Sequence, residues 1–86
     1  MEYYYNIDGA VVKVDDLDIE IMRLIKKNKE LLLFDIFPRT LEMYIKCLKM
    51  GQQNLIEVTK LRRNDDLTLD WEVRLTEFGR NVLLIN

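Results

Sequence analysis

Six basic residues between positions 39 and 63 have side chains whose type and spacing are suited to binding anions. They are Arg39, Lys46, Lys49, Lys60, Arg62 and Arg63. Arginine and lysine hold phosphate oxygens and read guanine edges. With two acidic residues, segment 39–63 has a net charge of +4, whereas residues 1–38 and 64–86 carry −3 each. The formal net charge of −2 therefore hides a positive centre that is a candidate for binding nucleic acid.

Catalysis and metal binding have little support in the composition. The chain has no histidine and a single cysteine, Cys47, so a conventional zinc site lacks ligands and an intramolecular disulfide cannot form. The commonest general base near neutral pH is also missing. The three glycines form no phosphate-cradling loop. We predict a protein that is not an enzyme, with no cofactor, no metal and an inert, partly buried thiol at Cys47.

Length and composition indicate one small globular domain. A chain of 86 residues, 49% hydrophobic and 33% charged, supports a single limited core, so we expect a homodimer. The longest apolar runs, such as Leu31–Phe34, are far shorter than the roughly 18 residues of a membrane span, and the N-terminus does not resemble a signal peptide. We therefore expect a cytoplasmic protein that does not bind membranes. Few prolines and glycines with many lysines, glutamates and isoleucines are compatible with a thermophilic archaeon or its virus.

The elements that must position the basic residues follow from local patterns. Aromatic and β-branched runs around Asp8-Gly9 predict a β-hairpin within residues 1–14. Helices are predicted at about 16–28, at 30–36, from 39 to about 51, and after the N-cap Thr76. The β-rich runs 55–61 and 69–75 flank a polar turn and predict a second hairpin, with Arg62 and Arg63 at its tip.

The predicted helix at 39–51 is amphipathic. Leu41, Ile45 and Leu48 have helical spacing and predict its buried face, which Tyr44 adjoins. The opposite, mostly basic face contains Glu42, Lys46, Lys49 and Gln53. A solvated face with ion pairs four residues apart explains the same pattern, and a solubilising tip explains Arg62 and Arg63. The cluster of Asp15, Asp16 and Asp18 fits either a divalent cation or the usual carboxylates at a helix N-terminus.

Three motifs carry a family resemblance: Thr40-Leu41-x-x-x-Ile45-x-x-Leu48, Leu55-Ile56-Glu57-Val58 and Arg74-Leu75-Thr76-Glu77-Phe78-Gly79-Arg80. In this order they resemble the winged helix-turn-helix superfamily, locally the multiple-antibiotic-resistance and phenolic-acid repressor families. The resemblance implies an α+β fold over residues 15–86, with a three-helix core, a C-terminal β-hairpin wing and a closing helix, after the hairpin at 1–14. The segment between the first two helices leaves no room for the first strand, which the N-terminal hairpin could replace.

The resemblance also implies a site. It implies a recognition helix at about 39–51 in the major groove and a wing at 60–68 on phosphates or in the minor groove. The implied DNA-binding residues are Arg39, Thr40, Glu42, Met43, Lys46, Lys49, Lys60, Arg62, Arg63 and Asn64. The leading hypothesis is a sequence-specific double-stranded DNA-binding protein, a transcriptional regulator that acts as a homodimer. The alternative is a winged-helix module for protein–protein contact in a replication, transcription or membrane-remodelling assembly, which the acidic flanks and Met43 favour.

Overall fold

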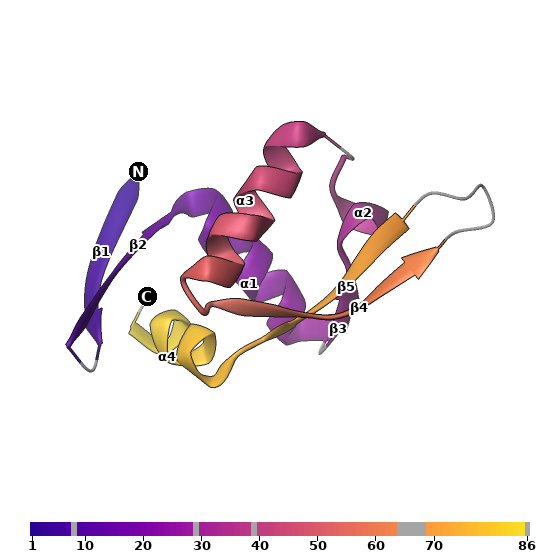
Figure 1. The fold of residues 1–86 in the computed structure, drawn as a ribbon. Coiled ribbons are helices and arrows are strands. Elements are labelled where there is room, and N and C mark those ends of the chain that lie inside the picture. The colour runs from indigo at the N-terminus through magenta and orange to yellow at the C-terminus, as the bar shows by residue number, and fades with distance from the viewer. Residues whose placement is uncertain (8, 29, 39, 64–68, 86) are drawn as a thin grey trace.

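The protein is an α+β chain with two separate antiparallel sheets. A computed structural model describes residues 1–86 except 8, 29, 39, 64–68 and 86 (Figure 1). In chain order its elements are β1 (Glu2–Ile7), β2 (Ala10–Asp15), α1 (Asp16–Asn28), β3 (Glu30–Leu32), α2 (Leu33–Ile36), α3 (Leu41–Gln52), β4 (Ile56–Arg63), β5 (Leu69–Leu75) and α4 (Glu77–Ile85). This order and the strand pairing are compatible with a winged-helix-like arrangement.

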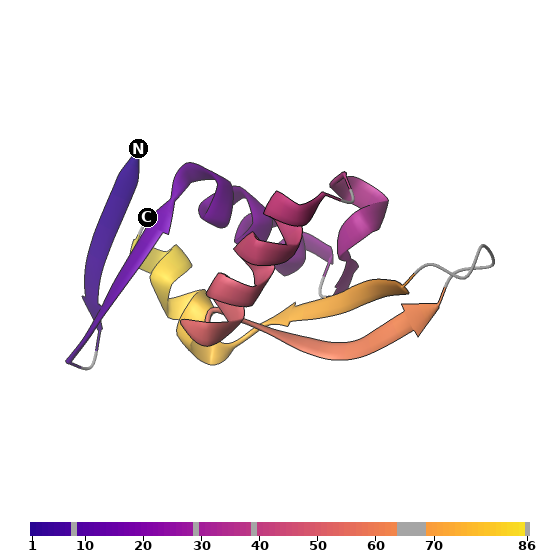
Figure 2. The same ribbon diagram turned by 45° about the horizontal axis from the view of Figure 1, so that its top comes forward.

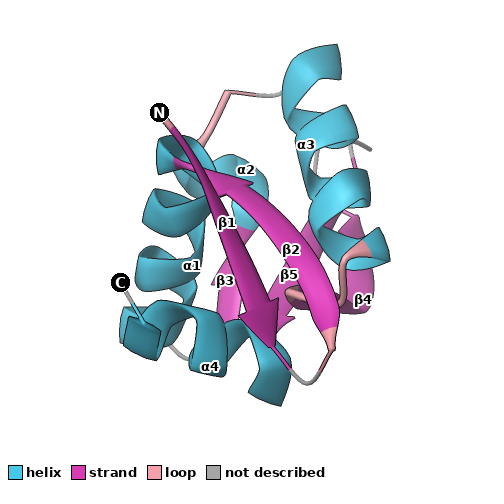
Figure 3. Ribbon diagram, turned by 90° about the vertical axis from the view of Figure 1, so that its left-hand side faces the viewer, coloured by secondary structure: helices cyan, strands magenta, loops and turns pink. Residues whose placement is uncertain are grey.

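The predicted N-terminal hairpin is confirmed. Strands β1 and β2 pair antiparallel, and Gly9 has φ +82°, a left-handed conformation that suits the tight turn. Val12 and Val14 of β2 are buried in the core, and their pairing partners Tyr5 and Tyr3 pack against it. The hairpin lies over the end of the body formed by α1, α3 and α4 (Figure 3). It therefore packs on the domain as a separate two-stranded sheet.

The second sheet has the strand order β3-β5-β4. Strand β3 pairs with β5 from Glu30↔Arg74 to Leu32↔Glu72. The prediction that residues 30–36 form a helix with no room for a strand was therefore wrong: three of these residues form β3, and α2 has only four residues. A short leucine-rich run has no period that separates a buried strand from a buried helix, and pairing with β5 decides the outcome. The N-terminal hairpin does not replace this strand.

Local capping interactions set the ends of helices α1 and α3. Helix α1 begins at Asp16 and ends at Asn28, as predicted. The Met43 N–H donates to the Thr40 hydroxyl at 3.2 Å, so Thr40 is the N-cap of α3. After α3, Asn54 takes a left-handed conformation with φ +61°. The predicted hairpin of β4 and β5 is also confirmed, with a register irregularity between Val58 and Lys60. The placement of Arg62 and Arg63 at its tip was wrong, because both residues pair with β5 as part of β4.

Helix α4 is joined closely to the start of β4. The Thr76 N–H donates to the Leu55 carbonyl at 3.2 Å, and the Thr76 hydroxyl accepts from the Gly79 N–H at 2.9 Å, as expected for a cap. A Cβ atom at position 79 would lie 2.1 Å from the Leu55 carbonyl oxygen. Only glycine therefore lets α4 pack this closely on the junction between α3 and β4.

The core lies between the helices and the three-stranded sheet. It includes Ile21, Met22 and Ile25 of α1, Met50 of α3 and Val73 of β5, all with almost no exposed surface. Figure 2 shows α3 in front of α1, and the hairpin of β4 and β5 extends from the side of the body opposite the N-terminal hairpin. These contacts set the rotation of α3 about its axis, and hence which of its side chains face solvent.

Candidate interaction surface on helix α3

Helix α3 turns an apolar stripe toward solvent. Leu41, Ile45 and Leu48 expose 74%, 42% and 55% of their surface, while Met43, Cys47 and Met50 are buried. Both sets repeat at i, i+4 and i+7, so each lies along one face of the helix. The prediction that Leu41, Ile45 and Leu48 form the buried face was therefore wrong. We call these three residues the α3 stripe.

Met43 does not occupy the outer position that the resemblance implied. Its side chain belongs to the hydrophobic core, so it cannot contact a groove without unpacking the helix. On the same inner side, burial raises the pKa of the Cys47 thiol to about 11, and the partly buried, inert thiol predicted there fits this position. The inner face of α3 is thus built from two methionines and a cysteine, which pack irregular gaps well.

Lys46 is held by two carboxylates of the N-terminal half. Its Nζ contacts Asp15 Oδ2 and lies 3.2 Å from Asp18 Oδ1, and 21% of its side chain is exposed. The contact between Lys46 Nζ and Asp18 Oδ1 is an ion pair, but the two groups are not aligned for a hydrogen bond. A DNA contact by Lys46 would require it to leave this arrangement, and moving it outward would leave the buried Asp18 without its cation.

Asp15 and Asp18 also cap α1 reciprocally. The Asp18 N–H donates to Asp15 Oδ1 at 2.8 Å, and the Asp15 N–H donates to Asp18 Oδ2 at 2.9 Å. Burial raises the pKa of Asp18 despite Lys46 nearby. Burial also acts against ionisation of Asp15, but Lys46 and the Asp18 N–H together lower its pKa. Both carboxylates are thus committed to a helix cap and an ion pair, which is a structural role.

The other implied site residues divide into two groups. Glu42 and Lys49 are exposed on one side of the α3 stripe, and Thr40 serves as the N-cap. The remaining five lie outside the part of the molecule that can be described: Arg39 and Asn64 entirely, and Lys60, Arg62 and Arg63 in their side chains, although these three belong to β4. Local spacing could not have found Asp15 and Asp18 as partners of Lys46, because 31 positions separate Lys46 from Asp15.

An aromatic contact ties α3 to the sheet. The rings of Tyr44 and Trp71 have centroids 5.3 Å apart and planes inclined by 80°, an edge-to-face arrangement. Such pairs add about 0.5–1.5 kcal/mol beyond the area they bury. With Lys46 on one side and Tyr44 on the other, α3 is held in the rotation that exposes Leu41, Ile45 and Leu48.

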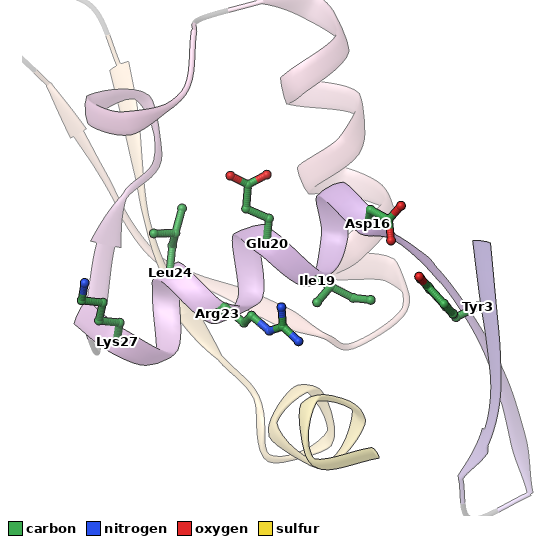
Figure 4. A pocket seen from close by; sticks show the side chains of 7 residues that line it. All are labelled: Tyr3, Asp16, Ile19, Glu20, Arg23, Leu24 and Lys27. Carbon is green, nitrogen blue, oxygen red and sulfur yellow. The ribbon is translucent and has the colours of Figure 1, made fainter. Parts of the chain in front are cut away.

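A separate hollow lies on α1, away from the α3 stripe. Its volume is about 400 Å³, and it runs along α1 beside the N-terminal hairpin, lined by Tyr3, Asp16, Ile19, Glu20, Arg23, Leu24 and Lys27 (Figure 4). Its charged side chains are spread along the helix and do not converge on one point. Within the described residues, no group of three His, Cys, Asp or Glu side chains is placed to bind a metal ion, and no helix is long and apolar enough to cross a membrane.

The comparisons with known proteins add no family. No family model, no curated protein and no solved structure matches the chain. The orientation of α3 is therefore the main structural guide to what the protein does.

Proposed function

We propose that the protein is a winged-helix module that binds a protein partner, and that α3 packs on an apolar helix of this partner rather than on base pairs. The observation that carries the proposal is the α3 stripe. Scattered exposed aliphatic side chains are normal on protein surfaces, but three aligned on one helix face form a seam for another helix. Full burial of each would contribute about 1.5–3 kcal/mol.

The stripe suits a protein surface better than a DNA groove. Base edges present hydrogen-bond donors and acceptors, and the thymine methyl is their apolar group in the major groove. Leucine and isoleucine pressed against these edges would leave base polar groups dehydrated and unpaired, which costs about 1–3 kcal/mol per group. Lys46 is also engaged by Asp15 and Asp18. On the outward side of α3, Lys49 is the exposed cation.

The surface sets requirements for its partner. A helix that fits needs apolar residues at i, i+4 and i+7 to match Leu41, Ile45 and Leu48. It also needs a basic residue opposite Glu42 and an acidic residue opposite Lys49, because both lie beside the stripe. These requirements define a testable probe: a labelled synthetic helical peptide with that stripe and those charges.

A pair of matched variants tests the proposal. Leu41 and Leu84 expose 74% and 75% of their surface, and both lie on helices, so glutamate at either position should be tolerated by the fold. In fluorescence anisotropy, Leu41→Glu should abolish peptide binding and Leu84→Glu should leave it unchanged. Equal binding by both variants, or a wild-type chain that does not bind the peptide at a dilution at which the chain is monomeric, would refute the proposal.

DNA binding is the second candidate, and the +4 charge of residues 39–63 favours it. Under this hypothesis a homodimeric regulator would contact phosphates through Lys49 and the hairpin of β4 and β5, which extends from the body (Figure 1). A mobility-shift titration with random duplex DNA at low salt separates the candidates. DNA binding predicts a retarded band that Lys49→Ala weakens and Leu41→Glu retains, whereas protein docking predicts no retarded band.

A further inference from the structure

We propose that the partner helix is α3 of a second copy of this chain, packed antiparallel across a two-fold axis beside Ile45. This rests on the proposed function, because it names the occupant of the α3 stripe. In this arrangement Ile45 meets Ile45 of the second copy, and Leu41 meets Leu48 of the second copy at two equivalent places. A two-fold interface requires a surface that complements itself, and a stripe with an aliphatic residue at its centre and one at each end does so.

The charges beside the stripe select the second copy and the direction of packing. At about 100° per residue, Glu42 and Lys49 lie on the same side of the stripe, about 10 Å apart along the axis. In an antiparallel two-fold pairing, the side of α3 that carries Glu42 and Lys49 lies next to the corresponding side of α3 in the second copy. Glu42 then faces Lys49 of the second copy, and Lys49 faces its Glu42. These exposed charges thus meet the partner requirements derived above.

A parallel pairing of the two α3 helices would not place an opposite charge beside Glu42 or Lys49. It would turn the side with Glu42 and Lys49 onto the opposite side of the second helix, which carries Tyr44 and Gly51. Neither charge would then meet an opposite charge. Self-association also suits a chain of 86 residues, because a second subunit enlarges an apolar interior that is limited at this size.

The pairing has a consequence for DNA. It covers the outer face of α3, the same face that the winged-helix resemblance assigns to the major groove. Self-association through α3 and insertion of α3 into a groove therefore exclude each other. A dimer that forms through α3 would leave the hairpin of β4 and β5, and not the helix, as the surface for any nucleic acid.

The oligomeric state of the full chain is the first test. Sedimentation velocity or light scattering over a dilution series should give the mass of a dimer that dissociates on dilution. Ile45→Glu places two carboxylates together at the axis and should give a monomer at every concentration. Leu84→Glu, an equally polar change on an exposed helical site outside the interface, should leave the dimer intact. Circular dichroism establishes that both variants are folded.

A charge exchange tests the geometry. Glu42→Lys or Lys49→Glu alone should weaken the dimer by up to about tenfold, since each replaces two exposed ion pairs by two repulsions. The double variant Glu42→Lys/Lys49→Glu should regain the wild-type dissociation constant. An equimolar mixture of the two single variants should form a mixed dimer more stable than either single-variant dimer.

The outcomes distinguish failure of the two-fold pairing from failure of the docking function. A wild-type chain that is monomeric throughout, a dimer that survives Ile45→Glu, or a charge exchange without recovery would overturn the two-fold pairing. If peptide binding is still lost in Leu41→Glu but not in Leu84→Glu, the docking function stands with a different partner. If the dimer survives Ile45→Glu and peptide binding is also insensitive to Leu41→Glu, both proposals fail together.

Discussion

Replacing Gly79 with alanine should destabilise the protein, although alanine is the better helix former. The added Cβ atom would lie 2.1 Å from the Leu55 carbonyl oxygen and 3.1 Å from its carbon. An ordinary contact between carbon and oxygen is more than about 3 Å, so α4 or the start of β4 must move by about 1 Å. The Leu55 carbonyl oxygen belongs to the backbone, so it cannot move away through a change of side-chain rotamer. The Leu55 carbonyl also accepts the Thr76 N–H, so the movement strains the cap of α4.

The expected magnitude comes from two opposing effects. Overpacking of this kind typically costs about 1–3 kcal/mol, and the move from glycine to alanine in a helix returns up to about 1 kcal/mol. We expect the free energy of unfolding to fall by about 1–2 kcal/mol, and the melting temperature by roughly 4–16 °C for a domain of this size. Urea titration followed by circular dichroism gives the first quantity, and thermal unfolding gives the second.

Gly51 provides the matched control. It also lies in a helix, α3, but no atom would come within 4 Å of a Cβ there. Gly51→Ala should therefore stabilise the protein by about 0.5–1 kcal/mol. If Gly79→Ala were as stable as Gly51→Ala, the close approach of α4 to Leu55 would not be a feature of the native protein, and the reasoning would be refuted.

Two further predictions concern buried groups. Lys46→Met should destabilise the protein near neutral pH far more than Lys49→Met, because it leaves Asp15 and Asp18 without their cation; urea titration of both variants measures this. The pKa of Asp15 is lowered in the wild type. The ionised Asp15 carboxylate therefore stabilises the fold above the ordinary pKa of aspartate, about 4, and this stabilisation is lost as the pH falls through the lowered pKa. In Lys46→Met, acidification toward about pH 4 should instead raise stability as the carboxylates protonate, and a variant that loses stability there would contradict the assignment. The Cys47 thiol, with its pKa raised to about 11, should react with a thiol reagent only after denaturation, whereas Leu84→Cys should show one promptly reactive thiol; prompt labelling of native wild-type protein would contradict its burial.

Local signals in the sequence predicted most elements and their ends. Asp8-Gly9 marked a turn and Thr76 marked the start of the last helix, because each of these signals depends on neighbouring backbone atoms. The Thr40 cap was not predicted, and it starts α3 at Leu41, two residues later than expected. The strand β3 was missed because it depends on residues that are distant in the sequence. Glu30-Leu31-Leu32 becomes a strand only through hydrogen bonds to β5, which lies about forty residues later.

The candidate site also depends partly on local sequence and partly on tertiary contacts. The sequence by itself determined that α3 is a helix with apolar residues at i, i+4 and i+7, that a positive segment lies between acidic flanks, and that the ligands of a conventional zinc site are missing. It contained two such apolar stripes, however, and helical periodicity does not say which faces inward. Tertiary structure decided this, because Asp15 and Asp18 hold Lys46, Trp71 contacts Tyr44, and Met43, Cys47 and Met50 fill the core. The rotation of one helix about its axis is set by contacts distant in sequence, and here it turns Leu41, Ile45 and Leu48 to solvent.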